Sequence, residues 1–399
     1  MDKKYLKTGI SLYINYIVHG MGVLILMQNV TALSEKWNTD IAGISGVVAM
    51  LGIGRLIAIY ISGRYSDILG RRPFVLLGMG IYIIFFAGIL ISPSVKWAMF
   101  CAVLAGIANS CLDSGTYPAL MESFPNAAGT ANVLIKAAVQ IGQFALPIII
   151  SLISSKGMWF GWSFVICIVL LIANAIFISR VDFPDAIDVS QKKEEVSNNV
   201  TELKKPAKMW VDGLAFIFYG FISQATFYLI SQYISLYGRE VAMMSDSAAA
   251  LLVSYYSMGS LVCVGVTALV AFKVKPIYLV VPYTLMSFVS IACMWLFPTP
   301  LVLSICAPLV GFFAAGGVMQ LGLTVMGEMF PQGKGTITGI FYTFGSIASY
   351  VIPVAAGKII QSNPRGIMLF DTVIAGIGFG LALIMYVRYK AIVGTKKGA

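Results

Sequence analysis

Long apolar stretches alternate with short polar connections along the whole chain. A helix that crosses a bilayer needs about 20 apolar residues, and in hydrocarbon it must satisfy its own backbone hydrogen bonds. The alternating pattern of a barrel strand is absent from these stretches. The pattern therefore predicts an all-α integral membrane protein with 12 transmembrane helices, at residues 9–31, 41–63, 73–92, 97–124, 129–155, 158–179, 209–236, 246–272, 276–297, 300–330, 335–361 and 365–389.

The composition excludes most other classes of protein. Of the 399 residues, 59% are hydrophobic and 11% are charged, and the mean hydropathy is +0.88. A soluble domain carries about 25% charged residues, so a soluble, disordered or disulfide-rich secreted protein is excluded. The six cysteines lie in apolar stretches without metal-ligand spacing and are predicted to be packing residues. The first stretch has full span length and no small-residue cleavage site, which predicts a retained helix.

Lysine and arginine are distributed unevenly over the connections. Of the 27 basic residues, the tails and even-numbered connections hold 19 and the odd-numbered connections hold six. Because cytoplasmic loops carry the excess of positive charge, both termini are predicted to be cytoplasmic in a cell-membrane protein. No patch of base-stacking aromatic residues accompanies the net charge of +10, so no nucleic-acid partner is expected.

The chain divides into two similar halves. A set of three short motifs, Glu-x-Phe-Pro followed by Gly-Thr and then Pro, recurs after 206 positions. The motifs begin at Glu122, Gly129 and Pro147 in the first copy and at Glu328, Gly335 and Pro353 in the second. The only long polar connection lies midway between these repeats. We therefore predict two pseudo-symmetric six-helix bundles, at residues 1–179 and 209–399, joined by a cytoplasmic linker at residues 180–208.

The connection between the second and third stretches carries the most specific motif, GRYSDILGRRP at residues 63–73. Gly63 is expected to let two helices approach closely, and Asp67 to cap a helix or pair with a base across the two halves. Arg71 and Arg72, which follow Gly70, are expected to hold the loop at the anionic leaflet. This motif resembles the cytoplasmic loop signature of the major facilitator superfamily.

The resemblance covers the whole chain, because the twelve helices, the two halves and the central linker also match. It implies a secondary transporter in which the motif residues lock one face shut, and Glu122 and Glu328 join this predicted gate as capping or pairing groups. Two departures occur: Ile68 replaces a basic residue, and the second-half counterpart at residues 273–276 is degenerate. The helix-five antiporter signature is poorly matched at residues 140–147, which disfavours drug export.

Charged groups inside the apolar stretches cluster in the first half, as His19, Arg55, Asp113 and Lys136. They lie about 10 to 17 Å from the predicted cytoplasmic end at about 1.5 Å per residue. A charge at the bilayer centre costs about 2.5 to 3.5 kcal/mol, so these groups are expected to face a common wet cavity. Helical spacing adds further polar positions to that cavity: Asn15, Asn109, Thr116, Tyr117, Gln140 and Gln143 in the first half, and Gln224, Tyr228, Gln232, Gln320, Thr324, Tyr342, Ser346 and Tyr350 in the second.

Roles follow from these positions. Asp113 and His19 are predicted to couple transport to protons, although Arg55 and Asp113 also fit a purely structural ion pair. Lys136 also fits a snorkelling side chain, and His19 a packing imidazole. Asp371 lies close to the outer surface and is expected to be solvated. The predicted substrate-binding residues are Arg55, Lys136, Asn109, Gln140, Gln224, Tyr228, Gln320 and Tyr342.

No phosphate-binding loop, metal-ligand cluster or activated nucleophile occurs in the sequence, so neither an enzyme nor an ATP-driven pump is predicted, and no cofactor or metal is expected. The net positive cavity favours a secondary active transporter that moves a small organic anion of the hydroxy-carboxylate type with a proton, by alternating access. The open alternatives are a proton-coupled drug or lipid-like efflux antiporter and a sugar or polyol permease. The expected partners are the substrate, protons and the lipid bilayer, and a monomer is expected.

Overall fold

The computed structural model describes residues 5–124, 127–184, 213–270, 274–316, 318–330 and 334–393, and their regular structure is helical. The helices are α1 (Leu6–Gln28), α2 (Val30–Trp37), α3 (Ile41–Leu69), α4 (Arg71–Ile91), α5 (Val95–Ser123), α6 (Ala128–Ser155), α7 (Trp162–Ile178), α8 (Leu214–Glu240), α9 (Asp246–Val270), α10 (Pro276–Leu296), α11 (Pro300–Val310), the π-helix η4 (Gly311–Ala315), α12 (Val318–Met329), α13 (Lys334–Ser362) and α14 (Gly366–Ile392).

Among the described residues, 11 helical segments are long and apolar enough to cross a membrane. One of them is composite, because α11, η4 and α12 follow one another over Pro300–Met329. The shorter apolar helix α7 corresponds to the sixth predicted stretch, and α2 is an additional short helix in the first connection. The predicted all-α membrane architecture is therefore confirmed.

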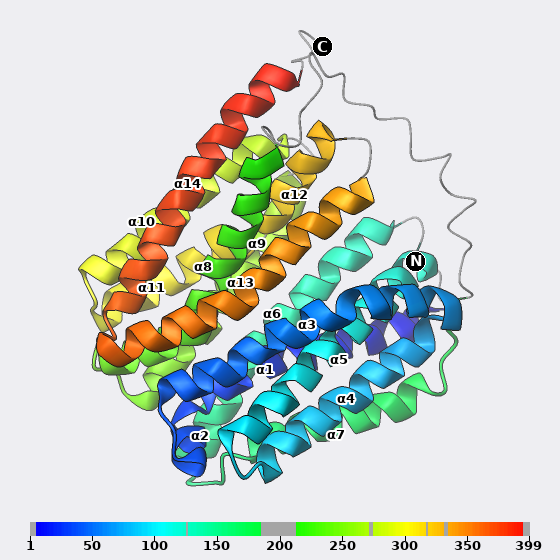
Figure 1. The fold of residues 1–399 in the computed structure, drawn as a ribbon, viewed down its shortest axis with the longest axis vertical. Helices are drawn as coiled ribbons and strands as arrows, with labels where there is room; N and C mark the ends of the chain where they lie inside the picture. Colours follow the sequence, from blue (N-terminus) through cyan, green and yellow to red (C-terminus); the bar gives the residue numbers. More distant parts are fainter. Residues whose placement is uncertain are drawn as a thin grey trace.

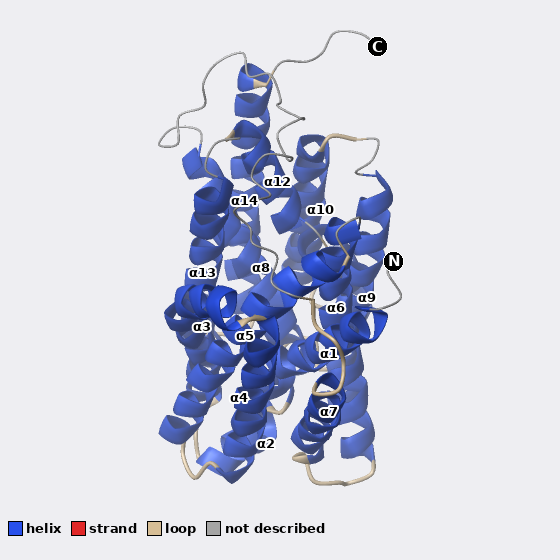
Figure 2. Cartoon of the chain, turned by 90° about the vertical axis from the view of Figure 1, so that its right-hand side faces the viewer, coloured by secondary structure: helices blue, strands red, loops and turns tan. Residues whose placement is uncertain are grey.

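The helices form two bundles that lie side by side. In Figure 1, α1 to α7 gather in one bundle and α8 to α14 in the other, and we call these the first and second bundles. Figure 2 shows most of the helices running along the long axis of the molecule. The N-terminal end of the chain and the C-terminal end of α14 lie toward the same end of the bundles (Figure 1).

The two bundles are joined toward the end away from the termini, where α3 packs against α13 and α6 packs against α9. The Tyr233 hydroxyl of α8 donates to the Ser45 hydroxyl of α3 at 2.9 Å, and Gln232 donates to the Val23 carbonyl at 2.9 Å. Further hydrogen bonds of this kind join Gln28 to Ser235, Arg239 to Thr31, Ser254 to Phe144 and Gln361 to Asp40. These residues lie in the remote halves of the long helices or, for Thr31 and Asp40, in the connection between α1 and α3 at the same end.

Closely packed helix crossings show that the two bundles repeat the same structure. A Cβ atom at Gly54 would lie 2.0 Å, and one at Gly106 2.1 Å, from a backbone oxygen of the facing helix. Gly259 and Gly311 stand 205 positions later, and a Cβ atom at either would lie 1.9 Å from a facing backbone oxygen. Small residues allow membrane helices to approach this closely. The repeat seen in the sequence motifs therefore extends to the packing of helices inside each bundle.

The crossing of α1 and α6 offers a test of the packing. A Cβ atom at Gly142 would lie 1.9 Å from the Ile17 carbonyl oxygen, whereas one at Gly80 would meet nothing within 4 Å. Gly142→Ala is therefore expected to lower the thermal unfolding temperature of the purified protein, because overpacking costs about 1 to 3 kcal/mol. Gly80→Ala is the matched control, and helix propensity predicts an unchanged or slightly raised temperature. Equal unfolding temperatures for the two variants would contradict this packing.

Candidate functional site

An ion pair joins α3 and α5 of the first bundle, near the middle of both helices. The Arg55 Nη2 atom lies 3.2 Å from Asp113 Oδ2, and the two side chains are 28% and 19% exposed. The Tyr16 hydroxyl of α1 donates to Asp113 Oδ1 at 2.6 Å. Within the described residues the Arg55 guanidinium makes one side-chain hydrogen bond, so other N–H groups remain for a ligand. The pair predicted from sequence is formed, and it is not sealed from its surroundings.

Groups from both bundles surround this pair. Lys136 on α6 interacts electrostatically with both Arg55 and Asp113. Tyr228 on α8 and Tyr342 on α13, which belong to the second bundle, lie within electrostatic range of Arg55. The Tyr342 hydroxyl in turn accepts a hydrogen bond from the Gln320 amide of α12 at 3.0 Å. The first bundle thus supplies the charges and the second supplies neutral hydrogen-bonding groups.

His19 lies one turn along α1 from Tyr16, and its ring contacts the Tyr16 ring edge-on with centroids 5.7 Å apart. The His19 Nδ1 atom is 2.5 Å from the hydroxyl of Tyr82 on α4. Tyr16 therefore touches both Asp113 and His19, the two predicted proton-coupling residues. Neither Tyr16 nor Tyr82 was predicted from sequence, and the one available signal was that Tyr16 is three positions before His19.

Several predicted cavity residues lie elsewhere. Asn15 is fully buried and accepts a hydrogen bond at 2.7 Å from Asn174 of α7, so the expectation that it faces the cavity is wrong. Gln232 contributes to the contact between the bundles. Of the predicted substrate-binding amides, Gln140 is buried, with 6% of its surface exposed, whereas Asn109 and Gln224 are partly exposed. Helical spacing identifies a face but not the helix that covers it.

Asp371 on α14 is also placed differently from the prediction. Its exposed fraction is 0%, so the expectation of a solvated side chain near the outer surface is wrong. The sequence gives the distance of a residue from the end of its helix, but the burial of Asp371 depends on the neighbouring helices that cover it. Asp371 stands only six residues into α14, which is why sequence position suggested exposure.

The motif at residues 63–73 is more helical than expected. α3 continues to Leu69 and α4 begins at Arg71, so Gly70 alone joins them, with a φ of 92° that favours glycine. Arg71 Nη1 lies 2.5 Å from Asp67, and Arg71 Nη2 lies 3.1 Å from Glu122 of α5. Asp67 thus pairs within the motif, and the expected pairing across the two halves is not seen among these contacts.

Two other motif residues and the second glutamate complete this region. Arg72 donates to the Ser179 carbonyl, after the end of α7. A Cβ atom at Gly63 would meet nothing within 4 Å, so the expected close helix approach at that glycine is wrong for this conformation. Glu328, the repeat counterpart of Glu122, accepts a hydrogen bond from the Tyr389 hydroxyl at 2.7 Å. The two glutamates therefore make different contacts in the two bundles.

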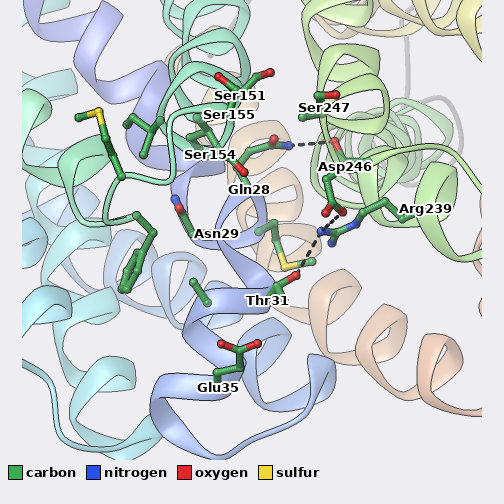
Figure 3. Close-up of a pocket in the computed structure, with 18 residues that line it drawn as sticks. Gln28, Asn29, Thr31, Glu35, Ser151, Ser154, Ser155, Arg239, Asp246 and Ser247 are labelled. Carbon is green, nitrogen blue, oxygen red and sulfur yellow. Dashed lines mark hydrogen bonds and ion pairs between the residues drawn. The ribbon is translucent and has the colours of Figure 1, made fainter.

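A cavity of about 460 Å³ opens between the bundles at the end away from the termini, between α1, α2 and α6 on one side and α8 and α9 on the other. Figure 3 shows Gln28, Thr31, Arg239 and Asp246 around it, with Arg239 bonded to Thr31 at 3.2 Å and paired with Asp246 at 3.5 Å. Arg55, Asp113 and Lys136 do not line this cavity. We call this cavity the vestibule; it lies at the end of the bundles away from the termini and is separate from the charged site.

Within the described residues, no group of three or more His, Cys, Asp or Glu side chains could hold a metal ion. Two helical bundles with charges and hydrogen-bonding groups between them are the architecture of a multi-pass membrane transporter. The family model of the Major Facilitator Superfamily matches residues 12–353, and the chain belongs to this superfamily.

Known proteins agree with this assignment. The chain is 46% identical to the inner membrane transport protein YdiM of Escherichia coli (strain K12) over 98% of its own length and 96% of that protein. It is 38% identical to the uncharacterized MFS-type transporter YfkL of Bacillus subtilis (strain 168), over 99% of its length and 100% of that protein. Both relatives are named as transporters.

Solved structures show the same fold. A D-xylose-proton symporter superposes with a TM-score of 0.78 at 12% sequence identity and covers 100% of both chains. A bacterial homologue of the human lysosomal transporter Spinster, in an inward-facing and occupied conformation, has a TM-score of 0.72 at 13% identity and covers 98% of both chains. The predicted fold of two pseudo-symmetric six-helix bundles is confirmed.

Proposed function

We propose that the protein is a secondary active transporter that carries a small organic anion of the hydroxy-carboxylate type across the inner membrane together with a proton. One observation supports this most directly: the Arg55 side chain, which lies between the two bundles, is 28% exposed and donates a single side-chain hydrogen bond, to Asp113. Lys136 adds a second cation, and Tyr228 and Tyr342 supply neutral hydroxyls from the opposite bundle. A carboxylate with hydroxyl groups matches both kinds of partner.

The proposed coupling follows from competition for Arg55. Without substrate, Arg55 compensates the Asp113 carboxylate. A substrate carboxylate binds the guanidinium through two parallel hydrogen bonds and displaces Asp113. Asp113, which loses the guanidinium as its direct ion-pair partner, is then neutralised by a proton. Loading one anion and one proton leaves the net charge of the site unchanged, with the substrate in place of Asp113 on Arg55, and the loaded bundles can then rock.

The contacts between the bundles suggest which face is open. The bundles are joined away from the termini, at pairs such as Tyr233 with Ser45. If the termini are cytoplasmic, as the distribution of basic residues predicts, the structure is the inward-open state, and the vestibule lies on the outer face of the membrane. In the proposed cycle this is the state that releases the anion and the proton into the cell.

A thermal-shift screen of the purified protein tests the substrate class. Hydroxy-carboxylates are expected to raise the unfolding temperature, more at acidic than at neutral pH, because the anion and the proton bind together. A ligand at about 100 times its Kd stabilises the folded state by about 2.7 kcal/mol. Sugars, polyols and cationic amphipathic drugs are the comparison sets. Stabilisation by one of those sets alone would favour the permease or the efflux antiporter and contradict the proposal.

A further inference from the structure

Asp371 on α14 is a buried acid that the charged site does not use. Its exposed fraction is 0%, and neither carboxylate oxygen completes a hydrogen bond within the described residues. None of the ion pairs between the described residues includes Asp371. Burying an ionised carboxylate without a partner is very costly, and such a group is neutralised instead.

Hydroxyl groups surround Asp371 where a cation would otherwise be expected. The Thr226 hydroxyl of α8 lies beside the carboxylate, outside good hydrogen-bond geometry, and the Tyr256 hydroxyl of α9 interacts with it electrostatically. Tyr256 is the titratable group near Asp371. Helices α8, α10 and α13 pack on α14, and their described residues contribute no charged side chain paired with Asp371. Hydroxyls can donate to or accept from a neutral carboxyl group.

Thr226, which lies beside Asp371, also lines a small cavity. The cavity has a volume of about 20 Å³, and it lies between α8, α10, η4 and α14. One water molecule needs about 10 to 15 Å³ and several polar partners. Side chains that line the cavity and carry a hydroxyl are those of Tyr219, Ser223, Thr226, Thr284 and Ser287. A water at this position can therefore contact the Thr226 hydroxyl.

The π-helix η4 forms part of the wall of this cavity, through Phe313 and Ala314. A π-turn inside a membrane span interrupts the regular hydrogen-bond ladder and is frequent at functional sites. A rearrangement of η4 would change the size of the cavity without moving α8 or α14.

We propose that Asp371 is a second proton-binding site, in the second bundle and separate from Asp113, which holds a proton in this conformation and exchanges it with water through the Thr226 cavity. On release, the carboxyl O–H bond breaks, and the proton passes along the Thr226 hydroxyl to a water in the cavity. The carboxylate that remains must be hydrated, so release accompanies widening of the cavity at η4. Rebinding of a proton from water reverses the step.

Infrared spectroscopy of the purified full chain tests the protonated state. The difference spectrum between wild type and Asp371→Asn is expected to contain the carbonyl stretch of a protonated carboxylic acid. Asn is neutral and similar in size, so the unfolding temperature is expected to stay unchanged. Carboxylate bands in place of the acid band would overturn the proposal. The measurement uses no substrate, so its outcome is independent of the proposed anion transport.

The exchange route needs a separate measurement. In Thr226→Val the shift of the Asp371 acid band after transfer into D₂O is expected to slow severalfold. Thr372→Val is the matched control, because the Thr372 hydroxyl donates to the Met368 carbonyl of its own helix at 2.6 Å. Equal exchange rates in all three proteins, or a band that never shifts, would overturn the route. If Asp371→Asn does not fold, Asp371→Glu assigns the band by shifting it.

Discussion

Asp113→Asn is expected to abolish uptake of the anion driven by a pH gradient in proteoliposomes while leaving counterflow exchange intact. The Asn side chain mimics the neutral, protonated acid, so the loaded carrier can still reorient, but it cannot release a proton on either side. The ion pair with Arg55 is also lost, which leaves the guanidinium fully available to the substrate. The two assays are run on the same reconstituted preparation, with the carboxylate that best stabilises the protein.

Asp182→Asn is the matched control for this experiment, because Asp182 is an exposed acid after the end of α7. Both uptake and exchange should match wild type in that variant. Gradient-driven uptake that survives in Asp113→Asn would show that Asp113 is not the coupling group. Loss of both activities would indicate a structural role for the ion pair instead.

Arg55→Gln is expected to weaken binding of the anion by about 10- to 100-fold. Hydrogen bonds to charged groups contribute about 1.5 to 3 kcal/mol, and about 1.4 kcal/mol corresponds to a tenfold change in Kd. Binding is measured by titration calorimetry of the purified protein at fixed pH. Arg55→Lys keeps the charge but not the two-pronged geometry, so an intermediate affinity is expected.

Removing Arg55 also leaves Asp113 without its partner, and breaking a buried pair costs about 3 to 5 kcal/mol. The double variant Arg55→Gln with Asp113→Asn should therefore recover stability without recovering affinity for the anion. Arg64→Gln changes an exposed arginine on the same helix and should bind like wild type. Unchanged affinity in Arg55→Gln, or recovered affinity in the double variant, would contradict the assignment.

The fold could be predicted from sequence because the bilayer restricts the choices so strongly. A span must be helical and about 20 residues long, and basic residues mark its ends. The pairing of Arg55 with Asp113 was also accessible, since either charge alone is too costly within a span. The span at residues 300–330 was predicted, but the π-helix η4 inside it was not, because a single inserted residue leaves no periodic signature.

The rest of the site depends on which helices become neighbours. Tyr16 and Tyr82 look like ordinary packing residues in sequence, and they acquire a role by meeting Asp113 and His19. Asn15 shares a helical face with His19, yet α7 covers it. Such assignments require the contacts between helices, which local spacing does not contain.

The unbroken course of α3 restricts how the two faces of the transporter can open. Its 29 residues span about 44 Å at about 1.5 Å per residue. Ser45 meets the second bundle near one end, Arg55 lies between, and the other end leads directly into Arg71 and its partners. A rigid rod that tilts about its middle swings its two ends in opposite directions. In the proposed cycle, substrate binding at Arg55 therefore acts on both faces through α3, and the two faces cannot open independently of each other.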